Sequence, residues 1–226
     1  MTRLRPTHSS GQEDGRGAIA SPSPADRVSA EVDGRARNRQ ERRDRVYRAA
    51  IDLFVEQGYG DTTMEDIADR AGVARATVFN HFERKAAFLD EWASRRRSNA
   101  RASLFQQGIG DDVRGRLARY LAELASLSTN SRDETVAVLG AAAHSMNIYT
   151  SPALADDLAE DLAEGQRQGR IRLDVDPRRA GSLLAAGYFL TLDKWAGGEP
   201  ESFELRDELM AMLDLLIFGL LVDCDH

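Results

Sequence analysis

Residues 62–82 carry the pattern of two short helices joined by a tight turn, and this pattern limits the fold more than any other feature of the chain. Either Thr62 or Thr63 can cap the first helix, with an acidic residue at the third position of a capping box. Gly72 supplies the turn, because glycine adopts backbone conformations that are costly for other residues. The second helix is expected over residues 75–81. The pattern predicts a helix-turn-helix, a motif whose second helix enters the major groove of DNA.

The remainder of the chain from residue 35 is also expected to be helical. Asn38 can cap the first helix and Gly58 can close it. No convincing alternation typical of a strand occurs, so the predicted fold class is all-α, with about nine helices. The apolar residues of the first helix recur at helical spacing, namely Val46, Ala50, Leu53 and Phe54.

Composition divides the chain into parts with different properties. Residues 1–34 are rich in Ser, Gly, Pro and charge and hold few large apolar residues, so we expect a disordered tail. Residues 35–85 hold 11 basic and 9 acidic residues, whereas residues 101–226 hold 12 basic and 21 acidic ones. The electric field of a charged group is screened within ~10 Å at moderate salt, so acidic residues far from a basic region do not prevent that region from binding phosphate. The net charge of −7 therefore does not exclude binding to nucleic acid.

The chain offers little material for metal, membrane or catalytic chemistry. One cysteine, Cys224, excludes an internal disulfide and a multi-thiolate site, and neither a metal nor a cofactor is expected. The longest apolar stretches, residues 180–192 and 215–222, are shorter than the ~20 residues that span a bilayer. We therefore expect a cytoplasmic protein without membrane contact. A Gly-rich phosphate loop, a Gly-x-Ser-x-Gly elbow and paired histidine ligands are absent, so an enzyme is not expected.

The run AAIDLFVEQGYGDTTMEDIADRAGVARATVFNHFERKAAFL, residues 49–89, resembles the TetR family of transcriptional regulators. The resemblance covers residues 39–89 without a gap. It implies an N-terminal three-helix DNA-binding domain with the helix-turn-helix over residues 35–85, and a C-terminal helical ligand-binding and dimerisation domain over residues 86–226. The implied function is that of a homodimeric repressor released from a palindromic operator by a small-molecule effector. An alternative is a DNA-binding regulator or nucleoid-organising protein with no small-molecule ligand.

The resemblance also implies which residues touch DNA. Arg75, Ala76 and Asn80 lie where family members contact base edges. Arg75 can bind guanine O6 and N7, and Asn80 can pair with adenine, each contact being worth ~1–3 kcal/mol of discrimination. Contacts with the phosphate backbone are expected at Thr63, Thr77, Phe79, His81 and Lys85.

Two positions depart from the family pattern. Ala74 replaces the hydroxyl residue that usually caps the second helix, and Phe79 replaces the more usual tyrosine. We therefore expect the affinity for DNA to depend more on the arginines that precede the motif. The alternative is that these arginines form a solvated helix face with salt bridges to Glu41 and Asp44. These arginines are Arg35, Arg37, Arg39, Arg42, Arg43, Arg45 and Arg48, of which Arg45 is included among the DNA-binding candidates.

Two C-terminal stretches are apolar on nearly every side. Residues 180–192 carry no charge, and residues 213–222 are interrupted only by Asp214. A helix that is apolar all round must be covered all round, and a second subunit is the natural cover. The predicted dimer interface comprises Gly181, Leu184, Ala185, Tyr188, Leu209, Met212, Leu213, Leu216, Ile217 and Leu220.

The ligand site is the least defined prediction. Pockets are mostly apolar with a few polar groups, although aromatic residues at helical spacing more often belong to the core. The effector is expected to be apolar or amphipathic. The acidic surplus leaves a cationic effector open, but Asp156, Asp157, Glu160, Asp161 and the arginine triplet at residues 95–97 are expected to face water. The candidate ligand-binding residues are Trp92, His144, Asn147, Tyr149 and Phe189.

Overall fold

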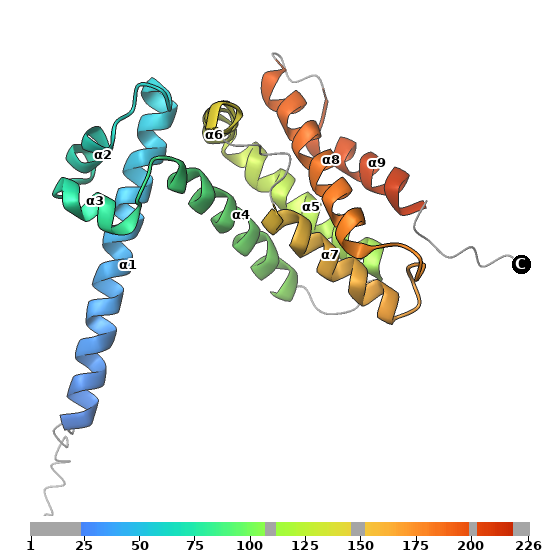
Figure 1. Ribbon diagram of the computed structural model, residues 1–226, viewed down its shortest axis with the longest axis horizontal. Helices are drawn as coiled ribbons and strands as arrows, with labels where there is room; N and C mark the ends of the chain where they lie inside the picture. Colours follow the sequence, from blue (N-terminus) through green and yellow to red (C-terminus); the bar gives the residue numbers. More distant parts are fainter. Residues whose placement is uncertain (1–23, 107–111, 146–151, 199–202, 219–226) are drawn as a thin grey trace, which may run out of the picture. The chain divides into compact units, whose positions relative to one another are not determined.

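The computed structural model describes residues 24–106, 112–145, 152–198 and 203–218, with side chains described for residues 34–104, 112–142, 152–198 and 203–218. Nine helices and no strand occur among these residues (Figure 1), so the all-α prediction is confirmed. The chain divides into two compact units, Met1–Arg42 and Arg43–His226. Within the described residues, no helix is both long enough and apolar enough to cross a membrane.

The helices have the following bounds. They are α1 Pro24–Gln57, α2 Met64–Ala71, α3 Arg75–His81, α4 Ala86–Gln106, α5 Val113–Asn130, α6 Arg132–Ser145, α7 Pro152–Arg167, α8 Pro177–Gly197 and α9 Leu205–Phe218.

Helix α1 begins earlier than the sequence predicted. It starts at Pro24, so Asn38 lies inside the helix and does not cap it, and residues 24–34, expected to form part of a disordered tail, are helical. The low apolar content that suggests a tail does not measure helix propensity, and proline is well tolerated in the first turn of a helix. At the other end, Gly58 has a φ of 87° and ends the helix as predicted.

The first of two apolar clusters, the N-terminal core, joins α1, α2, α3 and the start of α4. Phe54, Phe82 and Phe88 form its aromatic centre, with ring centroids of Phe82 and Phe88 4.1 Å apart. Three residues of α6 also pack in this core, namely Val138, Ala141 and Ala142. The N-terminal core extends past the predicted domain boundary at residues 85/86 as far as Trp92 on α4. The boundary itself stays a prediction.

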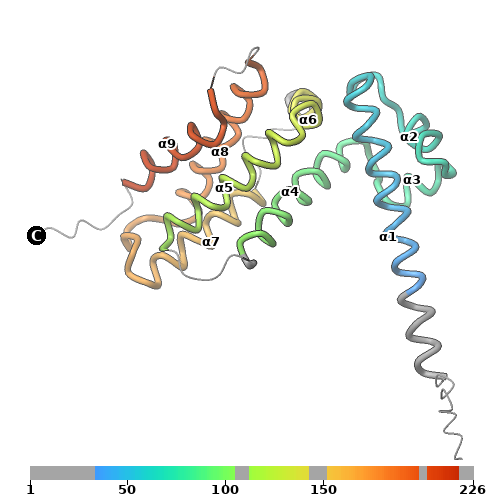
Figure 2. The backbone as a smooth tube through the Cα atoms, turned by 180° about the vertical axis from the view of Figure 1, so that it is seen from behind, coloured from blue at the N-terminus to red at the C-terminus, as the bar shows by residue number. Residues whose placement is uncertain are grey.

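The second cluster, the C-terminal core, is built by α5, α7, α8 and α9, which lie side by side in both views (Figures 1 and 2), together with residues of α4 and α6. Gly181 allows α8 to approach α7 closely. A Cβ at this position would lie 2.5 Å from the carbonyl oxygen of Ala155, so any larger residue would push the helices apart. The small residue therefore serves packing within the chain.

The burial pattern corrects the residues chosen for a dimer interface. Most of the predicted interface side chains on α8 and α9 are buried in the chain's own C-terminal core. They are not available to a second subunit, because neighbouring helices of the same chain cover them. Met212 and Leu216 are half-buried, and Leu220 lies outside the described residues. The buried positions are Gly181, Leu184, Ala185, Tyr188, Leu209, Leu213 and Ile217.

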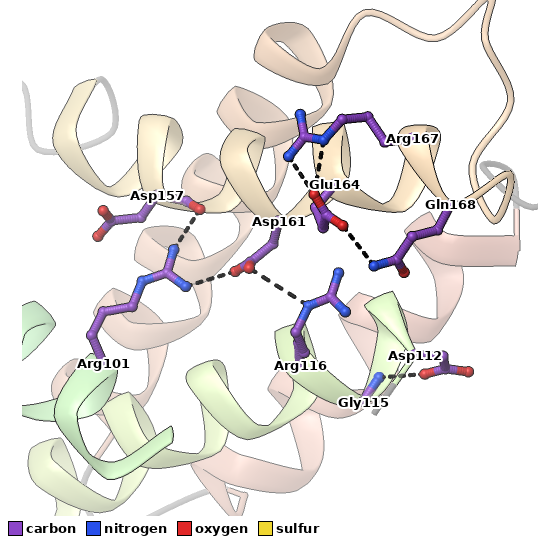
Figure 3. Close-up of polar contacts among 9 residues, drawn as sticks. All are labelled: Arg101, Asp112, Gly115, Arg116, Asp157, Asp161, Glu164, Arg167 and Gln168. Atoms are coloured by element: carbon purple, nitrogen blue, oxygen red, sulfur yellow. Dashed lines mark hydrogen bonds and ion pairs between the residues drawn. The ribbon is translucent and has the colours of Figure 1, made fainter. Parts of the chain in front are cut away.

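A largely buried ionic cluster links α4, α5 and α7 (Figure 3). Arg101 on α4 donates to the Asp161 carboxylate at 2.9 Å and to the Asp157 carbonyl at 2.6 Å. Asp157 also accepts from Arg97 at 3.2 Å and from the Tyr120 hydroxyl at 2.7 Å. The expectation that Asp157 and Asp161 face water is therefore wrong, whereas Asp156 and Glu160 are exposed.

The expectation that the arginine triplet is solvated is wrong as well. Arg95 ion-pairs with Asp44 at 2.5 Å, and Arg97 ion-pairs with Asp157. Arg96 is only 8% exposed. All three side chains point to partners that the surrounding helices supply.

Candidate nucleic-acid interface

A capping box fixes the start of α2. The Thr63 hydroxyl accepts from the backbone N–H of Asp66 at 3.1 Å, and the Asp66 carboxylate accepts from the backbone N–H of Thr63 at 2.8 Å. Hydrogen bonds from Thr63 lower the pKa of the Asp66 carboxyl. Thr62, the other predicted cap, is buried and donates its hydroxyl to the Gly58 carbonyl at 2.7 Å. The predicted box is confirmed, with Thr63 as the cap.

The turn and the second helix follow the prediction closely. Gly72 has a φ of 63°, the left-handed conformation that glycine adopts at little cost. Helix α3 spans the predicted residues, with Val78 and Phe82 buried beneath it. Ala74 provides no side-chain hydrogen bond at the start of α3, as its lack of a hydroxyl predicted.

The outer face of α3 brings the base-contact candidates together. Arg75, Ala76 and Asn80 are all exposed. The guanidinium of Arg75 lies 3.6 Å from the Glu65 carboxylate and over the ring of Phe79, 5.5 Å from its centroid. Phe79, which lacks the hydroxyl of a tyrosine, therefore serves as a platform for Arg75. This contact was not predicted, although the four-residue spacing of the pair could have indicated it.

The backbone-contact candidates differ in how free their side chains are. Phe79 is 38% exposed and Thr63 is exposed, whereas Thr77 and His81 are half-buried. Their contacts with phosphate stay predictions.

Lys85 has a structural role that the sequence did not indicate. Its ammonium donates to the carbonyl oxygens of Tyr59, Gly60 and Thr62, the last at 2.7 Å, and lies 4.3 Å from the centroid of the Tyr59 ring. An ammonium has three N–H donors, and these three acceptors occupy them. Partial burial lowers the pKa of the Lys85 ammonium. Lys85 thereby holds the loop that leads into α2.

Arg43 is likewise engaged within the protein. Its guanidinium donates to the His81 carbonyl at 2.8 Å and to the Glu91 carboxylate at 2.7 Å, and it lies over the Phe82 ring. Burial disfavours the charged form of Glu91, but hydrogen bonds from Arg43 and Arg95 outweigh it and lower the pKa of the carboxyl. Arg43 thus ties α1 to the end of α3, whereas Arg45 is exposed on α1, and its contact with DNA stays a prediction.

Two of the ligand candidates lie together. Trp92 on α4 and Phe189 on α8 line one small cavity with Arg96 and Tyr188. His144 lies in α6, but its side chain is not among those described. Asn147 and Tyr149 lie outside the described residues.

A capped helix, a glycine turn and a second helix with an exposed polar face define a DNA-binding protein of the helix-turn-helix class. Residues 46–92 match the family described as bacterial regulatory proteins, tetR family. FadR of Thermus thermophilus, a TetR family transcriptional repressor, is 31% identical with a TM-score of 0.62, and the match covers 80% of this chain and 95% of that one. The chain belongs to the TetR family of transcriptional regulators.

Other relatives match over different lengths. The transcriptional regulator YvkB of Bacillus subtilis is 39% identical over 67 residues, and this match covers 30% of the chain and only 35% of YvkB. IcaR of Staphylococcus aureus, a negative transcriptional regulator of the biofilm operon icaADBC, is 22% identical over 77% of this chain and 98% of its own length. Of these two relatives, the one whose match is short has the higher identity.

Proposed function

We propose that this chain is a repressor that binds a palindromic operator as a homodimer and is released from it by a small-molecule effector. The observation that carries the proposal is the exposed outer face of α3. Arg75 can donate two hydrogen bonds to guanine, and Asn80 can form a pair of hydrogen bonds with adenine. Arg75 is also held in place by Phe79, which reduces the entropy that base recognition costs.

Relatives support repression and an effector. The FadR of Thermus thermophilus is a repressor that was solved in complex with lauroyl-CoA. IcaR is a negative regulator. Both relatives support repression, and the FadR complex supports the binding of a small molecule.

Exposed apolar side chains on the last two helices support a homodimer. Leu183 and Leu190 on α8 are 62% and 49% exposed, and Leu215 and Phe218 on α9 are 78% and 76% exposed. Exposed apolar groups that gather on neighbouring helices mark interaction surfaces. These four residues replace the buried ones as the proposed interface, and Leu215→Asp with Phe218→Asp should convert dimer to monomer in analytical ultracentrifugation.

Base recognition is tested with DNA from upstream of the protein's own gene. Arg75→Ala and Asn80→Ala should each reduce the preference for this DNA over a scrambled sequence by ~1–3 kcal/mol, which is about 5- to 150-fold. Arg178→Ala, an exposed arginine at the start of α8, is the matched control and should leave the preference unchanged. The assignment of base contacts is wrong if both α3 variants keep the wild-type preference.

A second candidate is a DNA-binding regulator with no small-molecule ligand. The cavity beside Trp92 has a volume of ≈ 20 Å³, which is room for about one water, and this small size favours the second candidate. An effector that lowers operator occupancy by purified protein would decide for the first. DNA binding that no ligand changes would decide for the second.

A further inference from the structure

Arg96 on α4 is a buried cation whose hydrogen-bond partners carry no charge. Its guanidinium donates to the hydroxyls of Ser128, Ser131 and Thr135, at 3.4, 2.6 and 3.1 Å. None of its described neighbours within ion-pair distance is a carboxylate. Burial lowers the pKa of the Arg96 guanidinium, and the charge of the Glu134 carboxylate on α6 offsets only part of this effect. Since buried charges in proteins are ordinarily paired, this guanidinium is suited to receive an anion.

Two N–H donors on the side chains of Trp92 and Arg97 lack an acceptor within the described part of the chain. Trp92 Nε1 and Arg97 Nε are buried, and neither has a hydrogen-bond partner there. Trp92 is 5% exposed, and the Arg96 guanidinium lies 4.0 Å from the centroid of its ring. A buried indole N–H usually finds a partner. Three neighbouring side chains of α4 can therefore donate to the same kind of ligand, one rich in acceptor oxygens.

The three residues that carry these donors line the same small cavity. Trp92, Arg96 and Arg97 line one side of the ≈ 20 Å³ space, and the remaining wall is mainly apolar. No acidic side chain of the described residues lines it. The apolar wall comprises Ala93, Leu124, Leu154, Tyr188 and Phe189.

We propose that this cavity binds the carboxylate head of an amphipathic ligand. The inference rests on the proposed function, because it specifies the chemical class of the effector. The carboxylate accepts from Arg96 and from the unpaired donors, while the ligand's apolar chain packs on Leu124, Leu154 and Phe189. A cationic ligand would meet Arg96 unfavourably, and an uncharged apolar one would leave the donors without an acceptor.

The small volume requires that the ligand select a more open conformation of this site. The contacts of Arg96 indicate which helices would move when the cavity opens. Its hydroxyl partners lie at the junction of α5 and α6, and α6 packs in the N-terminal core through Val138, Ala141 and Ala142. A carboxylate that draws the guanidinium away from these hydroxyls releases the tie between α4 and α6, which both contribute to that core.

The test compares three ligands with the same ten-carbon chain and different heads. Decanoate, 1-decanol and decyltrimethylammonium are titrated calorimetrically into the full chain without DNA. We expect decanoate to bind at least about tenfold more tightly than decanol, and the ammonium compound not to bind. Arg96→Met should remove the preference for decanoate, Arg96→Lys should restore part of it, and Arg206→Met, an exposed arginine on α9, should leave it intact.

Three results would overturn the inference: equal binding of decanoate and decanol, an unchanged preference in Arg96→Met, or no binding of decanoate below its solubility limit. Circular dichroism and melting curves establish that each variant is folded. A separate assay measures operator occupancy. Decanoate that binds through Arg96 without lowering occupancy would refute the proposed release mechanism and leave the binding inference standing. Failure of the protein to bind DNA would refute the proposed function alone.

Discussion

Two of the arginines of helix α4, Arg96 and Arg101, lie five residues apart and have different electrostatic surroundings. Arg101 donates to the carboxylate of Asp161 (Figure 3). It also lies over the Tyr120 ring, 4.5 Å from its centroid. Arg96 lies over the Trp92 ring and meets only hydroxyls. Both arginines stack on an aromatic ring, so they differ in whether a carboxylate accepts a hydrogen bond from the guanidinium. The fold gives Arg101 a carboxylate within hydrogen-bond distance, whereas the hydrogen-bond partners of Arg96 are uncharged hydroxyls and the Glu134 carboxylate acts on it only from further away.

The hydroxyls around Arg96 do not depend on it for their own hydrogen bonds. Ser128 donates to the Leu124 carbonyl at 2.8 Å, Ser131 to that of Leu127 at 2.8 Å and Thr135 to that of Ser131 at 2.9 Å. Removal of Arg96 would therefore leave none of these donors unpaired. Removal of a member of the Arg101 cluster would leave a largely buried charge without its partner, which is strongly destabilising. Stability measurements can therefore separate the two sites.

The largest effect is expected for Asp161→Ala. This substitution leaves Arg101 and Arg116 without their shared carboxylate and should lower the free energy of unfolding by about 3–5 kcal/mol, measured by urea denaturation at pH 7. Glu160→Ala, an exposed carboxylate next to it on α7, is the control and should change stability by less than about 0.5 kcal/mol. Similar losses for both would show that the cluster is no more than a surface network.

A matched pair of arginine variants tests the comparison directly. Arg101→Met should destabilise the protein by about 2–4 kcal/mol, because Asp161 loses its closest cation while Arg116 remains near it. Arg96→Met should cost less than about 1 kcal/mol, since it removes a buried charge and leaves its hydroxyl partners paired. Equal losses in urea denaturation would contradict the distinction between the two sites.

Local signals predicted the helix-turn-helix in detail. The capping box at Thr63, the left-handed Gly72 and the inward side chains of Val78 and Phe82 all depend on residues within four positions of one another. The exposed candidates on α3 follow from this register. Local patterns did not reveal that Lys85 is bonded to carbonyls more than 20 residues away.

The ionic interior could not be predicted in the same way. Arg97 and Arg101 meet partners 60 residues further along the chain, so no spacing in the sequence connects them. A run of three arginines and a run of acidic residues each look solvated when read alone. The same reasoning failed for the dimer interface, because apolar residues on every side of a helix do not indicate which side the chain itself covers. Leu184 is buried, whereas its neighbour Leu183 is exposed.

A smaller effect is expected for Tyr120→Phe. Its hydroxyl donates to the Asp157 carboxylate at 2.7 Å, whereas the Trp92 ring that stacks on Arg96 donates to no described residue. Loss of a hydrogen bond to a charged group should cost about 1.5–3 kcal/mol, and the lower end is expected because Arg97 still pairs with Asp157. Urea denaturation at pH 7 measures this, and a change below about 0.5 kcal/mol would show that the hydrogen bond from the Tyr120 hydroxyl to Asp157 does not stabilise the fold.

The smallest effect is the alkaline dependence of stability. Burial, and then the hydrogen bond to Asp157, raise the pKa of Tyr120 above its ordinary 10.0. The unfolded chain therefore loses this proton first, so the stability that Tyr120 contributes is complete below pH 10 and is lost as the pH rises towards the folded-state pKa. Between pH 9 and pH 10.5 one such tyrosine costs about 0.8 kcal/mol. Tyr120→Phe should reduce the alkaline loss by this amount, and an identical pH profile for variant and wild type would show that the pKa of Tyr120 is not raised in the folded protein.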